Sequence, residues 1–274
     1  MRVIFFSITR IILALIVCGI LVSVLLYFIQ DKMIFYPQKI DQSDLEAIKK
    51  YKNVKEISLE TGDGVEIKGW LIDNRSTNKS KILLYFGGNA EEVSYIIPEA
   101  LLFKDCSVVL FNYRGYGKSQ GSPNEQNLYS DATVIYDRFV AQHNSDSPKI
   151  IIMGRSIGTG VAVYLAKNRK TDGVVLVSPY QDLKTLAQIQ FPFLPARLIV
   201  KYKFNSAERA PFIKAPLLAI IGNEDKTIPS NQSKLLIEKW GGKVILKEFI
   251  GADHNNLSNF GDYWKSINDF INTI

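Results

Sequence analysis

Three residues in the second half of the chain have side chains that could together cleave an acyl bond. Ser156 lies in Gly154-Arg155-Ser156-Ile157-Gly158 and could act as a nucleophile once a base removes its hydroxyl proton. His254 could be that base. Asp225 could accept a hydrogen bond from the Nδ1–H of the histidine, hold its tautomer and stabilise the imidazolium. The chemistry predicted from these residue types is acyl transfer through a serine.

The pattern G-x-S-x-G occurs twice, so its surroundings must decide between two serines. Ser156 follows the apolar run 150–153 directly and precedes the helix-like segment 159–167, which is the strand-turn-helix setting of a nucleophilic serine. Ser119, in the second copy, is separated from its strand by residues 112–116 and from the next helix by a turn. We therefore predict Ser156 as the nucleophile and Ser119 as a loop residue.

The base and the acid should follow late strands of the same sheet. Of the two histidines, His143 lies in a polar stretch at the amino end of a strand, whereas His254 follows the last strand. Asp225 follows the preceding strand and is the predicted acid, with Glu224 as the fallback and Asp182 as a weaker alternative. A turn-forming or helix-capping role is the competing interpretation of Asp225.

Acyl transfer also needs backbone N–H groups that bind the developing oxyanion. We expect one from Ile157, which follows the nucleophile. The other should come from Asn89, in the loop Phe86-Gly87-Gly88-Asn89-Ala90 after the first predicted parallel strand. The small residues of this loop allow backbone to approach a substrate closely, although a Gly-rich turn is the simpler interpretation.

These residues need a sheet whose strands end at one edge. An alternating pair, 54–59 and 65–72, predicts a hairpin. Short continuous apolar runs then alternate with segments of helical spacing, which predicts a doubly wound, mostly parallel α/β sheet. The predicted strands are 82–86, 108–111, 150–153, 174–177, 217–221 and 244–249, and the predicted helices are 98–103, 124–140, 160–167, 231–240 and 257–271.

The N-terminus has a different pattern. Residues 11–30 carry no charge, and about 20 helical residues span the 30 Å core of a bilayer. A cleaved signal peptide would end in a small-x-small site, which this run lacks. We predict an uncleaved single-pass anchor, with Arg2 and Arg10 favouring the rest of the chain on the non-cytoplasmic side, against Lys32 and Lys39 on the other flank.

The expected organisation follows from these patterns. It comprises an anchor (1–30), a polar connector (31–53) and one α/β domain (54–274) with a cap-like insertion (180–211).

Composition excludes several other classes of protein. The 274 residues are 47% hydrophobic with a net charge of +6, which excludes a disordered chain. Two cysteines exclude a disulfide scaffold and a Cys-rich metal site. The basic residues form no block, and the glycines at 115, 117 and 121 fit neither a dinucleotide-binding nor a Walker pattern. We therefore predict no cofactor, no metal and no nucleic-acid partner.

With these motifs in place, residues 54–274 resemble the α/β-hydrolase superfamily, and more narrowly its membrane-anchored serine hydrolases with one N-terminal span. The motifs that carry the resemblance are Ile34-Phe35-Tyr36-Pro37, Asn112-Tyr113-Arg114-Gly115-Tyr116-Gly117-Lys118-Ser119, Gly154-Arg155-Ser156-Ile157-Gly158 and Gly222-Asn223-Glu224-Asp225. The resemblance implies a triad of Ser156, Asp225 and His254. Two positions depart from the family pattern. Gly87-Gly88 replaces a usual His-Gly, and Asn112 replaces a usual Asp.

The function expected from residues and resemblance together is a membrane-anchored serine hydrolase. It would cleave carboxylic esters or thioesters of a small-molecule or lipid acyl substrate, through an acyl-enzyme on Ser156. The insertion would shape the acyl pocket. The alternatives are a serine peptidase or amidase with the same triad, and a non-catalytic membrane-bound binding protein on this fold.

Overall fold

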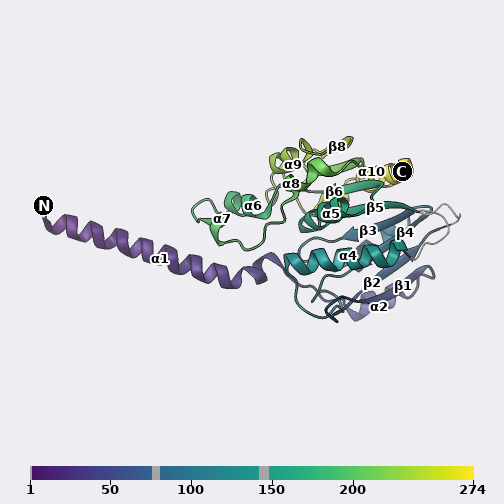
Figure 1. Ribbon diagram of the computed structural model, residues 1–274, viewed down its shortest axis with the longest axis horizontal. Helices are drawn as coiled ribbons and strands as arrows, with labels where there is room; N and C mark the ends of the chain where they lie inside the picture. Colours follow the sequence, from purple (N-terminus) through teal and green to yellow (C-terminus); the bar gives the residue numbers. More distant parts are fainter. Residues whose placement is uncertain (1, 76–80, 142–147) are drawn as a thin grey trace.

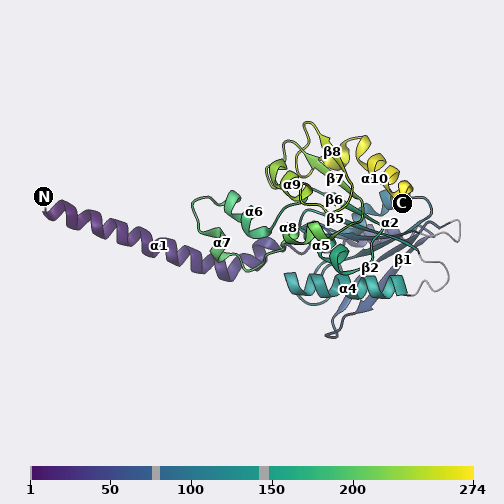
Figure 2. The same ribbon diagram turned by 45° about the horizontal axis from the view of Figure 1, so that its top comes forward.

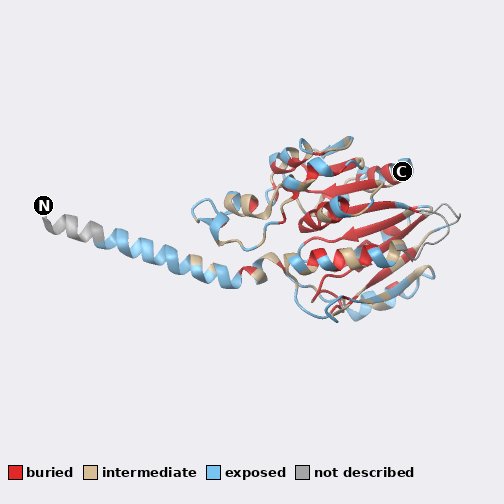
Figure 3. Ribbon diagram, in the orientation of Figure 1, coloured by how far each residue is buried: buried red, intermediate tan, exposed pale blue. Residues whose placement is uncertain are grey.

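A long N-terminal helix projects from a layered α/β domain in the computed structural model, which describes residues 2–75, 81–141 and 148–274 (Figure 1). This helix, α1 (Arg2–Ile34), is long and apolar enough between Arg10 and Ile34 to cross a membrane, by length and composition. Most of its described side chains are exposed, in contrast to the buried sheet (Figure 3). The helix runs four residues beyond the predicted anchor (34 against 30) and leads straight into the buried Phe35.

In the described residues, eight strands form one sheet in the order β1-β2-β4-β3-β5-β6-β7-β8. The strands are β1 (Val54–Glu60), β2 (Glu66–Asp73), β3 (Lys81–Phe86), β4 (Cys106–Phe111), β5 (Lys149–Arg155), β6 (Gly173–Val177), β7 (Leu217–Gly222) and β8 (Val244–Phe249). The β1–β2 and β2–β4 pairs are antiparallel, and the other five pairs are parallel. The predicted mostly parallel sheet with an N-terminal hairpin is confirmed.

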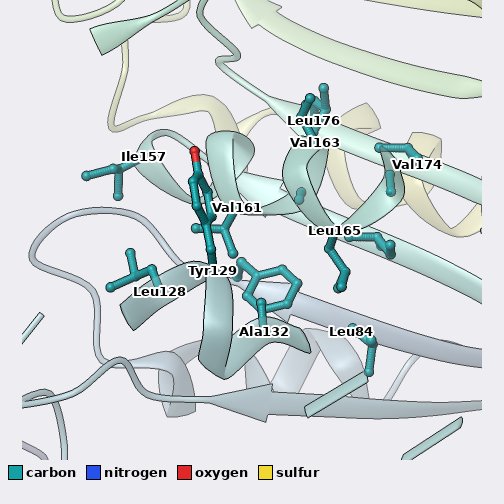
Figure 4. Packing of buried hydrophobic residues seen from close by; sticks show 14 of the residues in the cluster. Leu84, Leu128, Tyr129, Ala132, Ile157, Val161, Val163, Leu165, Val174 and Leu176 are labelled. Atoms are coloured by element: carbon teal, nitrogen blue, oxygen red, sulfur yellow. The ribbon is translucent and has the colours of Figure 1, made fainter. Parts of the chain in front are cut away.

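Helices cover both faces of this sheet (Figure 2). The strand residues between them are buried on both sides, which is why their sequences read as continuous apolar runs. On one face α4 packs against α5 through Leu128, Tyr129 and Val161 (Figure 4). The helices besides α1 are α2 (Gln42–Ile48), α3 (Ile97–Ala100), α4 (Glu125–Ala141), α5 (Ile157–Asn168), α6 (Leu183–Gln190), α7 (Ala196–Ile199), α8 (Ser206–Arg209), α9 (Ser230–Ile237) and α10 (Asp262–Thr273), with short 3₁₀ turns at Val93–Ile96, Ala210–Phe212 and Leu257–Asn259.

Two segments differ from the sequence-based expectation. The connector contains the helix α2, whose buried Ile48 joins the core on one face of the sheet. The helix expected over 98–103 is instead α3, a single turn that continues from a 3₁₀ turn. Both are too short for the periodicity of apolar residues to reveal them, and tertiary packing decides their structure.

The insertion between β6 and β7 projects away from the sheet. It contains α6, α7 and α8, and its outer part lies beside the C-terminal portion of α1 (Figures 1 and 2). Asp182, one of the weaker acid candidates, caps α6 by accepting a hydrogen bond from the Thr185 amide at 2.7 Å.

Arg114, in the loop after β4, holds the hairpin turn against α4. Its guanidinium, 4% exposed, donates to Asp131 at 2.7 and 2.8 Å and to Asp63 at 2.7 and 2.8 Å. Burial raises the pKa of Asp131, and the hydrogen bonds from Arg114 oppose that rise. The charge of the buried Asp131 carboxylate is therefore compensated by the Arg114 guanidinium.

We expect Arg114→Leu to destabilise the domain by about 3 kcal/mol, because it leaves Asp131 buried without its partner. The thermal midpoint of the full chain in detergent, measured at pH 7 by circular dichroism, should fall by roughly 6–12 °C. Asp63→Asn is the matched control, because the Asp63 side chain is exposed and solvent screens its ion pair, so the midpoint should fall much less. Equal midpoints for the two variants would contradict this account.

Candidate active site

Ser156 occupies a sharp turn between β5 and α5. Its backbone has φ 51° and ψ −122°, a strained conformation for a residue with a side chain. The two glycines of the motif make the turn possible. A Cβ at Gly154 would lie 2.5 Å from the Gly158 carbonyl oxygen, and a Cβ at Gly158 would lie 2.2 Å from that of Phe86. The motif is therefore a steric requirement of this turn, which presents the Ser156 hydroxyl at the carboxyl edge of the sheet.

His254 lies between Ser156 and Asp225. Its Nε2 is 3.0 Å from the Ser156 Oγ, and its Nδ1 is 2.8 Å from the Asp225 Oδ2. The three side chains come from the carboxyl ends of β5, β7 and β8, with β6 lying between β5 and β7 in the sheet. The structure thus brings the three predicted residues into one hydrogen-bonded chain. In this geometry, His254 can take a proton from Ser156 while Asp225 fixes its other nitrogen.

The Asp225 carboxylate is held in place from two sides. Its Oδ1 accepts hydrogen bonds from the amides of Thr227 at 2.9 Å and Ile228 at 2.7 Å, while its Oδ2 faces His254. Burial acts to raise the pKa of Asp225, but the hydrogen bond and charge of His254 and the Ile228 amide outweigh it, so the pKa lies below its ordinary value. The group is therefore an anion near neutral pH. Asp225 therefore also has the turn-forming role considered in the sequence analysis, because Oδ1 binds two amides of the turn while Oδ2 contacts His254.

Asn89 and Ile157 both line the cavity in front of Ser156. Ile157 is the first residue of α5, where an amide has no partner within the helix. Asn89 follows β3 and is fixed through its side chain, whose Oδ1 accepts a hydrogen bond from the Tyr36 amide at 2.7 Å. Both residues therefore line the same cavity as Ser156, and their amides are the candidates for binding an oxyanion.

Glu91 braces the loop that carries Asn89. Its buried carboxylate accepts hydrogen bonds from the Gly88 amide at 2.8 Å, from Arg155 at 3.1 Å and from the Tyr85 hydroxyl. Arg155 also donates to the His254 carbonyl oxygen at 3.2 Å, so one guanidinium joins the loop after β3 to the loop that carries the histidine.

Sequence reasoning missed the roles of Glu91 and Arg155. Two features of the sequence could have indicated these roles. Arg155 lies inside the G-x-S-x-G motif next to the nucleophile, and the acidic Glu91 directly follows the predicted oxyanion loop. Together they supply rigidity that the loop's two glycines cannot.

Ser119 and Glu224 take no part in the hydrogen bonds that join Ser156, His254 and Asp225. The Ser119 hydroxyl is buried, accepts a hydrogen bond from the Lys68 amide at 2.8 Å and donates to the Asn112 carbonyl oxygen at 3.1 Å, which is a structural role. Glu224 is exposed. His143 lies outside the described residues.

A cavity of about 480 Å³ opens in front of Ser156 and His254. Its size falls in the range of small-molecule sites. Apart from the catalytic candidates, its walls are mainly apolar side chains from α6, the following loop, α7 and the end of α1, including Leu183, Leu186 and Ile199. Such a lining suits an aliphatic group attached to the carbonyl that Ser156 would attack.

Comparisons with known proteins agree with the fold. A family model described as serine aminopeptidase, S33, matches residues 81–208. An uncharacterized protein of Mycobacterium tuberculosis is 31% identical over 247 residues, which cover 89% of this chain and 86% of that protein. An uncharacterized membrane protein of Saccharomyces cerevisiae is 27% identical over 263 residues, which cover 90% of each chain.

Among solved structures, an esterase of Pyrococcus furiosus superposes with a TM-score of 0.69 at 19% identity, over 88% of this chain and 97% of the esterase. At this identity the likeness concerns the fold alone. The N-terminal apolar helix and the yeast membrane protein indicate membrane anchoring. From the sheet topology, the turn at Ser156 and these relatives, the chain belongs to the α/β-hydrolase superfamily and to a group within it that includes membrane-anchored proteins.

Proposed function

We propose that this protein is a membrane-anchored serine hydrolase that cleaves carboxylic esters or thioesters. The observation that carries the proposal is the continuous contact from Ser156 through His254 to Asp225, at the mouth of an apolar cavity. Ser156 is the nucleophile, His254 the general base and acid, and Asp225 the residue that orients it. Asn89 and Ile157 contribute the amides that bind the oxyanion.

Acylation begins when the Ser156 Oγ attacks the substrate carbonyl carbon while its proton passes to His254 Nε2. The carbonyl electron pair moves to the oxygen, which the two amides stabilise. The tetrahedral intermediate then collapses, the bond to the leaving oxygen or sulfur breaks, and the leaving group takes the proton from His254. Asp225 accepts the Nδ1–H bond and stabilises the imidazolium that exists between these two steps.

Deacylation repeats these transfers with water as the nucleophile. His254 removes a proton from the water as its oxygen attacks the acyl carbon of the ester on Ser156. When the second tetrahedral intermediate collapses, Ser156 leaves, takes that proton back, and a carboxylic acid is released. The cycle returns every group to its starting protonation state.

The apolar cavity favours an acyl chain over the charged amino terminus of a peptide, because an ammonium group would lose its hydration there. The description of the matching family model, serine aminopeptidase, supports a peptidase as the second candidate. An esterase and a peptidase would share these catalytic steps. They would differ in the substrate group that occupies the cavity.

Matched substrates separate these candidates. We expect kcat/KM for a p-nitrophenyl ester and for the corresponding thioester to exceed that for an aminoacyl p-nitroanilide by at least a hundredfold. Purified full chain in detergent micelles, assayed on all three at pH 7.5, gives the comparison. A preference for the anilide would assign a peptidase, and turnover of none of them, by a folded protein that a fluorophosphonate probe fails to label, would refute a serine hydrolase.

The proposed organisation keeps the predicted units: anchor 1–30, connector 31–53 and hydrolase domain 54–274 with its insertion at 180–211. We further propose that the domain lies on the non-cytoplasmic side, because Arg2 and Arg10 precede the span. Accessibility of a Cys introduced at the exposed Lys226 to a membrane-impermeant maleimide, before and after the membrane is opened, tests this orientation.

A further inference from the structure

The end of α1 forms one side of the cavity that holds Ser156 and His254. Leu26, Gln30, Met33 and Ile34 all line it. Leu26, Gln30 and Ile34 recur at intervals of four residues, so they share one face of the helix, and this face is less exposed than the rest. From Leu26 to Ile34 the helix rises about 12 Å. The C-terminal part of α1 therefore forms one wall of the cavity over about 12 Å.

Gln30 fixes the insertion to this wall. Its side chain is only 5% exposed, although it lies at the end of an apolar span. The amide nitrogen donates to the Ile199 carbonyl oxygen at 3.2 Å, and the amide oxygen accepts from the Lys201 amide at 2.8 Å. A buried polar side chain whose donor and acceptor are both satisfied by one partner segment defines the position of that segment.

A second set of contacts continues this junction toward the domain. The Tyr202 hydroxyl donates to Asp31 at 2.8 Å, and the Phe35 ring packs edge-on against Tyr202 at 5.3 Å. The next residue, Tyr36, donates its amide to the Asn89 side chain. The chain thus passes from the span to the proposed oxyanion loop through a continuous series of contacts, so the end of α1 is joined to the site.

The insertion carries exposed apolar side chains, and its helix α7 contacts α1. Phe193 is 99% exposed, Leu198 84% and Phe191 48%, and Phe191 also lines the cavity. In both views the outer part of the insertion lies along α1 and away from the sheet (Figures 1 and 2). An exposed apolar group beside a membrane-spanning helix is suited to the bilayer that this helix crosses. Arg197 and Lys201, close by in sequence, suit the headgroup region.

We infer that the last turns of α1 are part of the acyl-binding site, and that this site takes a long acyl chain from the surface of the membrane that α1 spans. The aliphatic chain lies against Leu26, Met33 and Ile34, and its carbonyl carbon lies at Ser156. The exposed tip of the insertion rests in the same leaflet and keeps the mouth of the cavity at the bilayer. This inference rests on the proposed hydrolase function for its chemistry, but the chain-binding site can be tested separately.

Filling the wall tests the inference on the full chain in phosphatidylcholine nanodiscs. Leu26→Trp and Met33→Trp should lower kcat/KM for p-nitrophenyl laurate at least tenfold more than for p-nitrophenyl butyrate, because the larger side chain takes space needed only by a long chain. Leu25→Trp is the matched control, since Leu25 is 57% exposed and does not line the cavity. A laurate-to-butyrate ratio that shifts equally in all three variants would overturn the inference and leave the hydrolase function standing.

A second readout does not need turnover. Lauric acid with a terminal diazirine, added to Ser156→Ala in the same nanodiscs, should cross-link to α6, and Leu26→Trp should reduce that product severalfold while Leu25→Trp should not. If these cross-links form but no ester is hydrolysed by the wild type, the chain site stands and the hydrolase function fails. Cross-links confined to the lipid-facing side of α1, with none on α6, would overturn the chain site. The source of the acyl chain is tested by comparing two preparations of the full chain. If the membrane delivers the chain, the rate of laurate ester hydrolysis should be higher in nanodiscs than in detergent micelles supplied with the ester from solution. Equal rates in the two preparations would overturn delivery from the membrane.

Discussion

Replacing Ser156 by Ala should reduce ester hydrolysis by about 10⁶-fold in kcat, the scale of loss when the nucleophile of a serine triad is removed. The reason is geometric. Only Ser156 has its hydroxyl 3.0 Å from the His254 Nε2, among the serines of the described residues, and without it no acyl-enzyme can form. Steady-state hydrolysis of p-nitrophenyl butyrate gives the rate. Intact-mass measurement of covalent labelling by a fluorophosphonate gives an independent readout.

Ser119→Ala is the matched control, because Ser119 lies in the second copy of G-x-S-x-G. Its hydroxyl is bound by the backbone of Lys68 and Asn112, so its loss should cost about 1 kcal/mol of stability. Labelling and kcat should stay within twofold of the wild type. Labelling that survives Ser156→Ala, or that disappears with Ser119→Ala in a folded protein, would exclude Ser156 as the nucleophile.

The sheet could be predicted because each of its signals is local. The runs at Ile150–Met153 and Leu217–Ile221 are buried on both faces, so they are continuously apolar, and the hairpin turn contains Gly64 with φ 78°. The positions of Ser156 and His254 followed because a strand end fixes the edge on which the next residue lies. The contact between the two still depended on the strand order β5-β6-β7-β8, which the strand-helix alternation by itself does not fix.

Other parts of the site depend on contacts between residues far apart in the sequence. The sequence pattern of residues 11–30 predicts an anchor, but nothing in it indicates that Gln30 would contact Ile199 and Lys201. Likewise, Glu91 and Arg155 are 64 residues apart, and each alone looks like an ordinary surface charge. Burial of such groups becomes visible only when the sheet brings β3 and β5 side by side.

Replacing Asp225 by Asn should lower kcat by about 10⁴-fold with the fold retained. The reason lies in the hydrogen bonds around this side chain. The amides of Thr227 and Ile228 both donate to Oδ1, so the carbonyl oxygen of an Asn would stay there and its NH₂ group would face His254. Because that NH₂ can only donate, the His254 Nδ1 must become an acceptor. The proton then sits on Nε2, which can no longer take the proton of Ser156.

Kinetics on p-nitrophenyl butyrate measures this loss, and Glu224→Gln is the control, because Glu224 is the adjacent exposed carboxylate. The Gln variant should retain kcat within twofold. If instead Glu224→Gln lost activity and Asp225→Asn kept it, the fallback acid would replace Asp225 in the proposed site.

The pH dependence of stability gives a second test of Asp225 with a defined sign. Its folded pKa lies below the ordinary value, so the unfolded chain binds the proton more tightly, and stability from this group rises with pH. That contribution is complete above the unfolded pKa of about 3.9 and is lost as pH falls through the folded pKa. Between pH 7 and 3, the thermal midpoint of Asp225→Asn should therefore decline less than that of the wild type. A steeper decline in the Asn variant would mean that the carboxylate is not stabilised as an anion by His254 and the two amides, and the mechanism would lose its orienting group.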